Sequence, residues 1–254
     1  MAYTQSDATR RWNRNAQSWH QYYGEKDPNR RDLLDPLILD LLGDVSGKRI
    51  LDAGCGDGYF SRKLRARGAI VTGVEAAAEM LALATGEESK AQPAISYRLG
   101  SVSSMDFLDG GIFDTVITNN VIQDVEKYQE AFKEFNRVLR RGGEYIHVEN
   151  HPCFSLAGAG WVRDEQGNRL YRKVDYYFNR EPFLSQWRSD SGMEPSVVWH
   201  RTLSDVMNSL ISVGFHITRV IEPEPPESWR DNERQNDAFR IPEFLVLVCK
   251  KAMG

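Results

Sequence analysis

Short apolar runs alternate along the chain with longer segments in which apolar residues recur every three or four positions. The short runs predict buried strands, and the longer spacing predicts amphipathic helices packed on them. Regular alternation of the two predicts an α/β domain. The expected strands are one that begins at Ile50, then Ile70–Glu75, Ile95–Leu99, Phe113–Thr118, Glu144–Glu149, Phe215–Ile221 and Phe244–Lys250.

Capping signals mark several of the helices. Asp35 and Pro36 suit an N-cap and the first helical position, and Thr202 opens a Thr-x-x-Asp capping box. Asp124 is expected to cap the helix that follows the fourth strand, and a role as base or substrate anchor is the alternative. The expected helices are Arg11–Tyr23, Asp35–Leu42, Phe60–Arg67, Ala77–Thr85, Glu126–Leu139 and Thr202–Val213.

From Asn150 to about Arg201 the chain leaves this alternation and becomes rich in aromatic residues. Val162–Lys173 reads as a hairpin that turns at residues 165–168. An aromatic segment placed over the edge of the sheet suits a cap on a substrate pocket. A dimer interface, and with it a homo-oligomer, is the alternative.

Composition narrows the class of protein. The 254 residues are 41% hydrophobic, which is enough for one sizeable core. The net charge of −4 provides no general field that would attract nucleic acid. No apolar run is long enough to cross a bilayer, and the polar N-terminus does not resemble a signal peptide. The three scattered cysteines suggest neither a disulfide framework nor a metal site, so a reducing cytoplasm is expected.

The chemistry centres on a corner rich in glycine, Ile50–Phe60, where the first strand turns into a helix. Glycines bring backbone N–H groups and the start of the helix close to a ligand. A dinucleotide site would require a third glycine where Tyr59 stands, which disfavours a nicotinamide dehydrogenase. Asp52, just before the first glycine, would repel a pyrophosphate but could accept from an ammonium group. The corner therefore favours a ligand with a cationic amino-acid end.

The run LDAGCGDGYF is similar to motif I of the class I S-adenosylmethionine-dependent methyltransferases. The similarity covers nearly the whole chain and is strongest from Arg49 to Glu149, which includes the LRRGG run at residues 139–143. The chain resembles the small-molecule methyltransferases of ubiquinone biosynthesis in particular, and its His-Pro-Cys-Phe run resembles a bacterial subgroup of these. The resemblance implies a Rossmann-like sheet of seven strands in the order 3-2-1-4-5-7-6. The last strand would be antiparallel, with helices on both faces and a substrate cap inserted.

This resemblance also implies a division of the single domain. Residues 1–46 would form an N-terminal helical lid, and residues 47–150 the cofactor-binding core. Residues 151–201 would form the cap insertion, and residues 202–254 the closing helix and strand hairpin.

The implied cofactor is S-adenosylmethionine, and its product is S-adenosylhomocysteine. Glu75 ends the second strand just over twenty residues after the glycines, where an acid suits the two ribose hydroxyls of an adenosine. Ser101 stands where relatives place an aspartate for the adenine amino group, and a hydroxyl accepts that bond more weakly. The expected cofactor-binding residues are Asp52, Gly54, Cys55, Gly56, Glu75, Ala76, Ser101, Val102 and Asn119.

The implied reaction is direct displacement at the sulfonium methyl by a small-molecule nucleophile. O-, N- and C-methylation all stay open. After the fourth strand, Asn-Asn-Val-Ile differs from the Asn/Asp-Pro-Pro-aromatic run of enzymes that methylate bases or glutamine, which argues against a nucleic-acid acceptor. A non-catalytic protein that binds the cofactor, or a partner subunit, is the alternative function.

Candidate residues for the acceptor come from the leading helix and the insertion. Trp19 and Tyr22 are expected at the pocket from the helical lid, and Tyr176 and Tyr177 from the cap. His151 and His200 are the candidate bases, because histidine titrates in the useful range. A capping or structural role is the alternative for each histidine.

Overall fold

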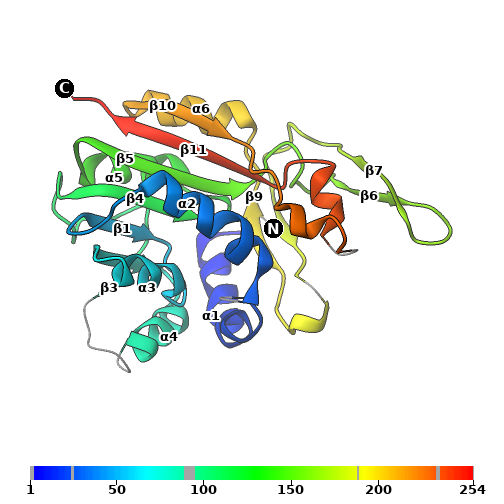
Figure 1. The fold of residues 1–254 in the computed structure, drawn as a ribbon, viewed down its shortest axis with the longest axis horizontal. Coiled ribbons are helices and arrows are strands. Elements are labelled where there is room, and N and C mark those ends of the chain that lie inside the picture. Colours follow the sequence, from blue (N-terminus) through cyan, green and yellow to red (C-terminus); the bar gives the residue numbers. More distant parts are fainter. Residues whose placement is uncertain (1–2, 24–25, 89–94, 188, 233–234, 254) are drawn as a thin grey trace.

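Seven strands form one twisted sheet in a computed structural model that describes residues 3–23, 26–88, 95–187, 189–232 and 235–253 (Figure 1). Their order is β3-β2-β1-β4-β5-β11-β10, which is 3-2-1-4-5-7-6 in chain order and confirms the expected topology. β11 runs antiparallel to both β5 and β10. The strands are β1 Arg49–Ala53, β2 Ile70–Glu75, β3 Ser96–Leu99, β4 Phe113–Asn119, β5 Leu139–Asn150, β10 Phe215–Ile221 and β11 Phe244–Lys251.

Helices cover both faces of this sheet (Figure 1). On one face α2 and α3 pack against a cluster that includes Ile50 and Ile117. On the other, α5 and α6 pack against Leu51 and Val116, the neighbouring strand positions. Because successive side chains of a strand point to opposite faces, the apolar runs supply both layers. The helices are α1 Gln5–Tyr22, α2 Asp35–Leu42, α3 Tyr59–Ala66, α4 Ala78–Glu88, α5 Tyr128–Val138 and α6 Leu203–Ser212.

α1 lies across the carboxyl edge of the parallel strands, packed against α4 and β9. It begins at Gln5, earlier than expected, because Thr4 and Asp7 form a capping box. A π-helical turn, Asn29–Leu34, leads directly into α2, so Asp35 is not an N-cap. The Asp35 carboxylate instead accepts from the Tyr59 hydroxyl at 2.8 Å and forms an ion pair with Lys63.

The insertion contains two small antiparallel pairs of strands. β6 Gly160–Arg163 and β7 Arg169–Lys173 form the predicted hairpin, which projects from the body of the molecule (Figure 1). β8 Pro182–Ser185 pairs with β9 Ser196–Trp199, a pair that the sequence pattern did not reveal. A short helical turn at Ser189–Ser191 lies between β8 and β9. Outside the insertion, short helical turns lie at Ile122–Asp124, Glu227–Trp229 and Asn236–Phe239.

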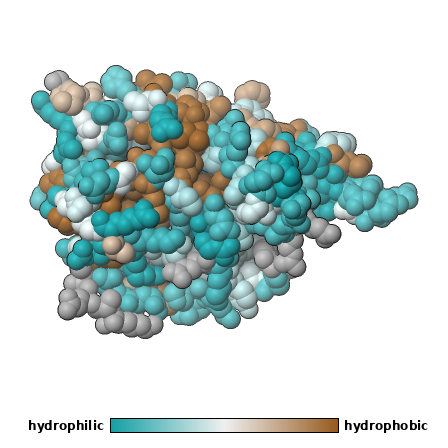
Figure 2. Space-filling model, viewed as in Figure 1, coloured by the Kyte–Doolittle hydropathy of each residue, from teal (hydrophilic) through white to brown (hydrophobic). Residues whose placement is uncertain are grey.

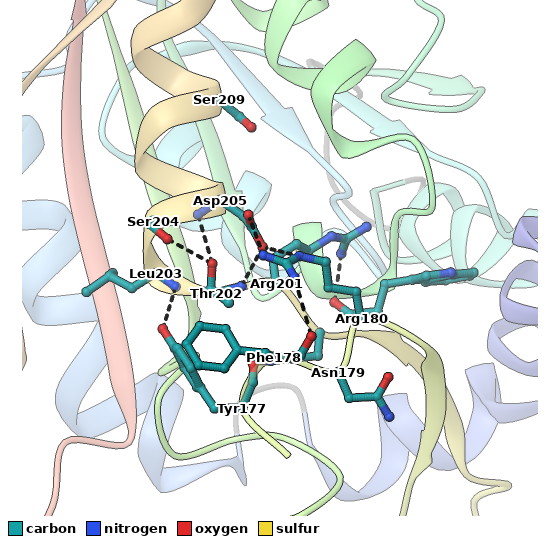
Figure 3. A network of polar contacts seen from close by, with 12 residues as sticks. Tyr177, Phe178, Asn179, Arg180, Arg201, Thr202, Leu203, Ser204, Asp205 and Ser209 are labelled. Atoms are coloured by element: carbon teal, nitrogen blue, oxygen red, sulfur yellow. Dashed lines mark hydrogen bonds and ion pairs between the residues drawn. The ribbon is translucent and has the colours of Figure 1, made fainter. Parts of the chain in front are cut away.

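A polar network at the start of α6 ties the insertion to the core (Figure 3). Thr202 and Asp205 form the predicted capping box. Arg180 donates to both Asp205 oxygens, at 2.7 and 3.0 Å, and this contact lowers the Asp205 pKa to about 2. The Tyr177 hydroxyl accepts from the backbone N–H of Leu203 at 2.9 Å. These contacts fix the segment that lies between the insertion and the sheet.

The surface is mainly hydrophilic, with a hydrophobic area over α2 and the adjoining strands (Figure 2). Leu37, Leu41 and Ile221 are partly buried and pack against the core. The projecting hairpin is mostly hydrophilic in the same view. Across the described residues, every helix is too short or too polar to span a bilayer.

Candidate functional site

The glycine corner connects β1 to α3 at the carboxyl edge of the sheet. Gly54, Gly56 and Gly58 all adopt positive φ, at 80°, 56° and 74°, which L side chains rarely tolerate. The backbone N–H groups of Gly54 and Cys55 both donate to the carbonyl of Val74, at 2.7 and 3.0 Å, and this holds the turn against β2. A Cβ atom at Gly54 would come within 2.5 Å of Val121, whereas one at Gly56 would meet nothing within 4 Å. The corner is therefore packed at Gly54 and open at Gly56.

A cavity, here called the cofactor cavity, opens at this corner. Its walls come from the ends of β1, β2 and β4, from the loop after β3, and from α1. Seven of the predicted cofactor residues line it together, although they lie far apart in sequence: Gly54, Gly56, Glu75, Ala76, Ser101, Val102 and Asn119.

Glu75 is the best-defined polar group of this cavity. Its Oε2 accepts from the backbone N–H of Gly56 at 3.0 Å, and its Oε1 accepts from that of Ala77 at 2.8 Å. Each carboxylate oxygen has a second lone-pair direction, so the group can still accept from two ligand hydroxyls. Burial raises the Glu75 pKa, and the backbone N–H bonds oppose that shift.

Asn119 carries a buried hydrogen-bond donor that a polar ligand could satisfy. Within the described part of the chain, Asn119 Nδ2 is buried without a hydrogen-bond partner. An unmet buried donor is costly, so it indicates a group that a ligand satisfies. Ser101 Oγ accepts from the N–H of Ser103 at 3.2 Å and keeps its own proton to donate. Gly56, Glu75 and Asn119 thus make a cradle suited to an adenosine with a polar amino-acid end.

Asp52 and Cys55 lie beneath the corner and do not line the cavity. Asp52 Oδ2 accepts from the Ser61 hydroxyl on α3 at 2.6 Å, and burial raises its pKa to about 6. Burial likewise raises the pKa of the Cys55 thiol well above its usual value. Both side chains are buried and absent from the lining, and the direct cofactor contacts expected of them stay a prediction.

A second, larger cavity of about 940 Å³ adjoins the first, and we call it the acceptor cavity. Trp12, Trp19, Tyr22, Tyr23 and Trp187 form one of its walls. The rings pack closely: Trp187 lies 5.7, 5.6 and 5.3 Å from the centroids of Trp12, Trp19 and Tyr23. This wall joins α1 to the insertion, and a cavity of this size accommodates a small organic molecule.

The comparisons with known proteins agree with this geometry. Residues 51–147 match the family described as a methyltransferase domain. The chain is 28% identical to a ubiquinone biosynthesis O-methyltransferase of Pseudomonas paraeruginosa, over 61% of this chain and 68% of that protein. It is 36% identical to a malonyl-[acyl-carrier protein] O-methyltransferase of Hamiltonella defensa, over 60% of this chain and 52% of that protein.

A solved structure extends the match beyond the central domain. An S-adenosylmethionine-dependent methyltransferase from Mesorhizobium loti superposes with a TM-score of 0.71 and 27% identity, covering 85% of this chain and 96% of that one. The chain belongs to the class I S-adenosylmethionine-dependent methyltransferases. This methyltransferase is an enzyme whose cofactor is S-adenosylmethionine.

Neither candidate base of the methyltransferase lines the cofactor cavity or the acceptor cavity. His151 is buried, its Nδ1 accepts from the N–H of Cys153 at 3.2 Å, and its Nε2 lies 2.9 Å from Glu222 Oε1. His200 is buried with Nε2 donating to the Tyr177 carbonyl at 2.8 Å, and burial lowers its pKa. The ring nitrogens of both histidines are engaged in these contacts, as the structural alternative expects, and the base role of each stays a prediction.

The predicted aromatic residues divide into two groups. Trp19 lines both cavities and Tyr22 lines the acceptor cavity. Tyr176 and Tyr177 line neither: Tyr176 is 68% exposed, and Tyr177 is tied to the start of α6. The described cavities therefore do not include these two tyrosines, and their expected role in acceptor binding stays a prediction.

Further residues line the cavities besides the expected site residues. Trp12 lies seven residues before Trp19 on the same helix, so helical spacing could have placed it at the cleft. The N-cap expected of Asp124 is wrong, because α5 begins at Tyr128. Asp124 lines both cavities instead, and the alternative role as base or substrate anchor stays a prediction. Trp187 and Arg30 carry no comparable signal, because only the tertiary fold brings them beside α1.

Proposed function

We propose that the methyltransferase transfers its methyl group to a small-molecule acceptor bound in the acceptor cavity. One observation carries the proposal: five residues line both cavities, so the two spaces share a wall at the end of β4. These residues are Trp12, Trp19, Arg30, Asn120 and Asp124. An acceptor beside that wall would lie next to the methionine end of the cofactor.

The cofactor would be held by groups already described. Glu75 suits the ribose hydroxyls, Asn119 the amino-acid end, and Ser101 the adenine amino group. S-adenosylmethionine supplies a methyl group on a positively charged sulfonium, which is already reactive. The protein then has to align the nucleophile and exclude water.

The chemistry of the acceptor cavity favours a flat, partly apolar molecule. Its aromatic wall offers stacking surfaces, and Arg30 lies over the Trp19 ring at 5.2 Å. Among the named relatives, one is an O-methyltransferase of ubiquinone biosynthesis and one acts on malonyl-[acyl-carrier protein]. The first kind of acceptor is a small molecule, which suits a cavity of about 940 Å³ with an aromatic wall.

α1 and the insertion are proposed to act as lid and cap. α1 lies over the cofactor cavity through Gln5, Thr9, Trp12 and Trp19, and Trp187 of the insertion packs on it. The two together would shield the reacting groups from water. With Cys55, Cys153 and Cys249 all free, a reducing cytoplasm is the proposed location.

A methyl-transfer screen against a metabolite library, read by mass spectrometry, tests the proposal. We expect at least one small molecule to gain a single methyl group and one equivalent of S-adenosylhomocysteine to form. A protein that binds S-adenosylmethionine in calorimetry but methylates nothing in the library would support the non-catalytic alternative.

A further inference from the structure

One carboxylate stands at the junction of the two cavities. Of the five residues that line both, Asp124 is the only one with a side chain that can take up a proton, since the others are two indoles, an amide and a guanidinium. It ends a short helical turn, Ile122–Asp124, directly after β4. Its side chain therefore stands where the space for the acceptor meets the space for the cofactor.

Within the described residues, the Asp124 side chain is held by a hydrogen bond but has no ion-pair partner. Trp12 Nε1 on α1 donates to its Oδ2 at 3.1 Å. Within the described residues its Oδ1 accepts no hydrogen bond, and no ion pair to its carboxylate is formed. One oxygen is therefore anchored by the proposed lid, and the other is left for a ligand.

Arg201 fixes the backbone on both sides of this residue. Its guanidinium is buried and donates to the carbonyls of Ile122 and Val125, and its carbon atom lies 4.4 Å from the centroid of the Tyr128 ring. Gln5 donates to the Asp124 carbonyl at 3.2 Å. A loop held from α1 and from the start of α6 can position a reacting group to within the tolerance that catalysis requires.

Two nearby residues of the same loop carry further acceptor atoms. Within the described chain, Asn120 Oδ1 and Gln123 Oε1 are buried and without partners, and both residues line the acceptor cavity. Asn120 also adopts a left-handed backbone, with φ at 59°, which is costly for a residue other than glycine. Three unmatched acceptor oxygens on one wall suit a ligand that arrives as a hydrogen-bond donor.

The charges that face Asp124 keep it poised for proton exchange. Removal from water raises its pKa to about 8, and the indole of Trp12 and the charge of Arg201 oppose this shift. Glu75, across the cofactor cavity on β2, raises it slightly further. Arg30, from the turn before α2, is the cation that lines the same junction. A positive charge placed in the cofactor cavity would favour the ionised carboxylate.

We propose that Asp124 accepts the proton of the incoming nucleophile, and that the sulfonium charge of the cofactor brings it into the ionised form that can do so. The inference rests on the proposed function. The nucleophile gives its proton to Asp124 Oδ1, and its electron pair forms the bond to the methyl carbon. The bond from that carbon to sulfur breaks with its pair on sulfur, so the cofactor leaves uncharged. Asp124, now protonated, releases its proton to water when the site opens.

A binding experiment on the full chain tests the charge coupling without any acceptor. S-adenosylmethionine and S-adenosylhomocysteine are titrated by calorimetry from pH 6.5 to 9 in buffers with different heats of ionisation. We expect the affinity for S-adenosylmethionine to rise with pH, by up to about tenfold per unit, with release of a proton. The affinity for uncharged S-adenosylhomocysteine should stay nearly constant.

Two variants make the result specific to this residue. Asp124→Asn keeps an oxygen for Trp12 and should abolish the proton release while S-adenosylhomocysteine binds within about twofold of the unchanged protein. Asp27→Asn is the matched control, because Asp27 lines only the acceptor cavity and also has a pKa raised by burial. Proton release that persists in Asp124→Asn, or that is lost in Asp27→Asn, overturns the coupling.

Turnover with the acceptor found in the library screen tests the proton transfer itself. In the unchanged protein we expect kcat to rise with pH as Asp124 ionises. Asp124→Asn should lower kcat by about 10²–10⁴-fold and abolish this rise. Turnover within threefold of the unchanged protein would overturn the role as proton acceptor. A library without an acceptor would count against the proposed function, whereas the calorimetric result would still decide whether Asp124 responds to the cofactor.

Discussion

Glu75 serves both the fold and the site. Its carboxylate closes the glycine corner by accepting from Gly56 and also faces the cofactor cavity. The acid could be assigned from its place at the end of a predicted strand. The backbone bonds that hold it could not, because they depend on how two distant turns approach each other.

Glu75→Ala should weaken binding of S-adenosylhomocysteine by at least about tenfold. The variant removes charge-assisted acceptors, each worth about 1.5–3 kcal/mol. Calorimetry measures the change, and Glu130→Ala on the exposed side of α5 is the control. An unchanged dissociation constant with the fold intact would remove Glu75 from the cofactor site.

His151→Gln should lower stability and leave the chemistry unaffected. The ring spans two contacts, to Cys153 and Glu222, and the variant can keep only one of them. We expect a loss of about 1–2 kcal/mol in the free energy of unfolding, with turnover and cofactor affinity nearly unchanged. Exposed His216→Gln is the control in denaturation and activity assays. A collapse of kcat with normal stability would restore the base role.

Asp52 should make the folded protein less stable as the pH rises. An acid held in an ion pair has the opposite effect. Burial raises its pKa from 3.8 to about 6, so the folded protein binds the proton more tightly than the unfolded chain. The free energy of unfolding therefore falls as pH rises from about 4 to 6. Relative to the protein with Asp52, Asp52→Asn should gain up to about 3 kcal/mol across this window and nothing further above it. Urea unfolding at pH 4.5 and 7 measures the difference, and parallel curves would contradict the assignment.

At the scale of elements, most boundaries follow from local signals. β2 and β10 have the bounds expected from their apolar runs, and α6 begins at its capping box. α1 begins earlier than expected because a polar first turn carries little hydrophobic periodicity. β8 and β9 were not predicted, since two strands of four residues pair only when the insertion folds back on itself.

Trp187→Ala should speed release of S-adenosylhomocysteine. Trp187 makes three ring contacts with α1 and the following residue Tyr23, each worth about 0.5–1.5 kcal/mol, so its loss favours opening of the lid. We expect the dissociation rate in stopped-flow fluorescence to rise by roughly tenfold or more. Phe178→Ala, at a ring that is 76% exposed on the same insertion, is the control. Equal rates in both variants would show that the aromatic wall does not gate the cofactor.

At the scale of the whole molecule, the rise in melting temperature with a bound ligand should show which cofactor the fold accepts. Tyr59 is buried where a dinucleotide fold needs glycine, and its hydroxyl is bonded to Asp35. At a hundred times its dissociation constant, S-adenosylhomocysteine adds about 2.7 kcal/mol of stability. For a chain of this size we expect the melting temperature to rise by about 5–10 °C, and NAD to leave it unchanged. A comparable rise with NAD would contradict the assignment of the corner.

The resemblance to the methyltransferases implied the strand order of the sheet. The residue patterns by themselves determined the order of the elements and the position of the glycine corner. These depend on periodicity, on caps and on a glycine corner, all of which act over a few residues. Only the tertiary structure decided which side chains face the cavities. It turned His151 and Tyr177 into supports of the insertion and brought Trp12, Trp187 and Asp124 together from three separate elements. The physical reason is that a side chain's surroundings come from the packing of distant segments, which no local pattern records.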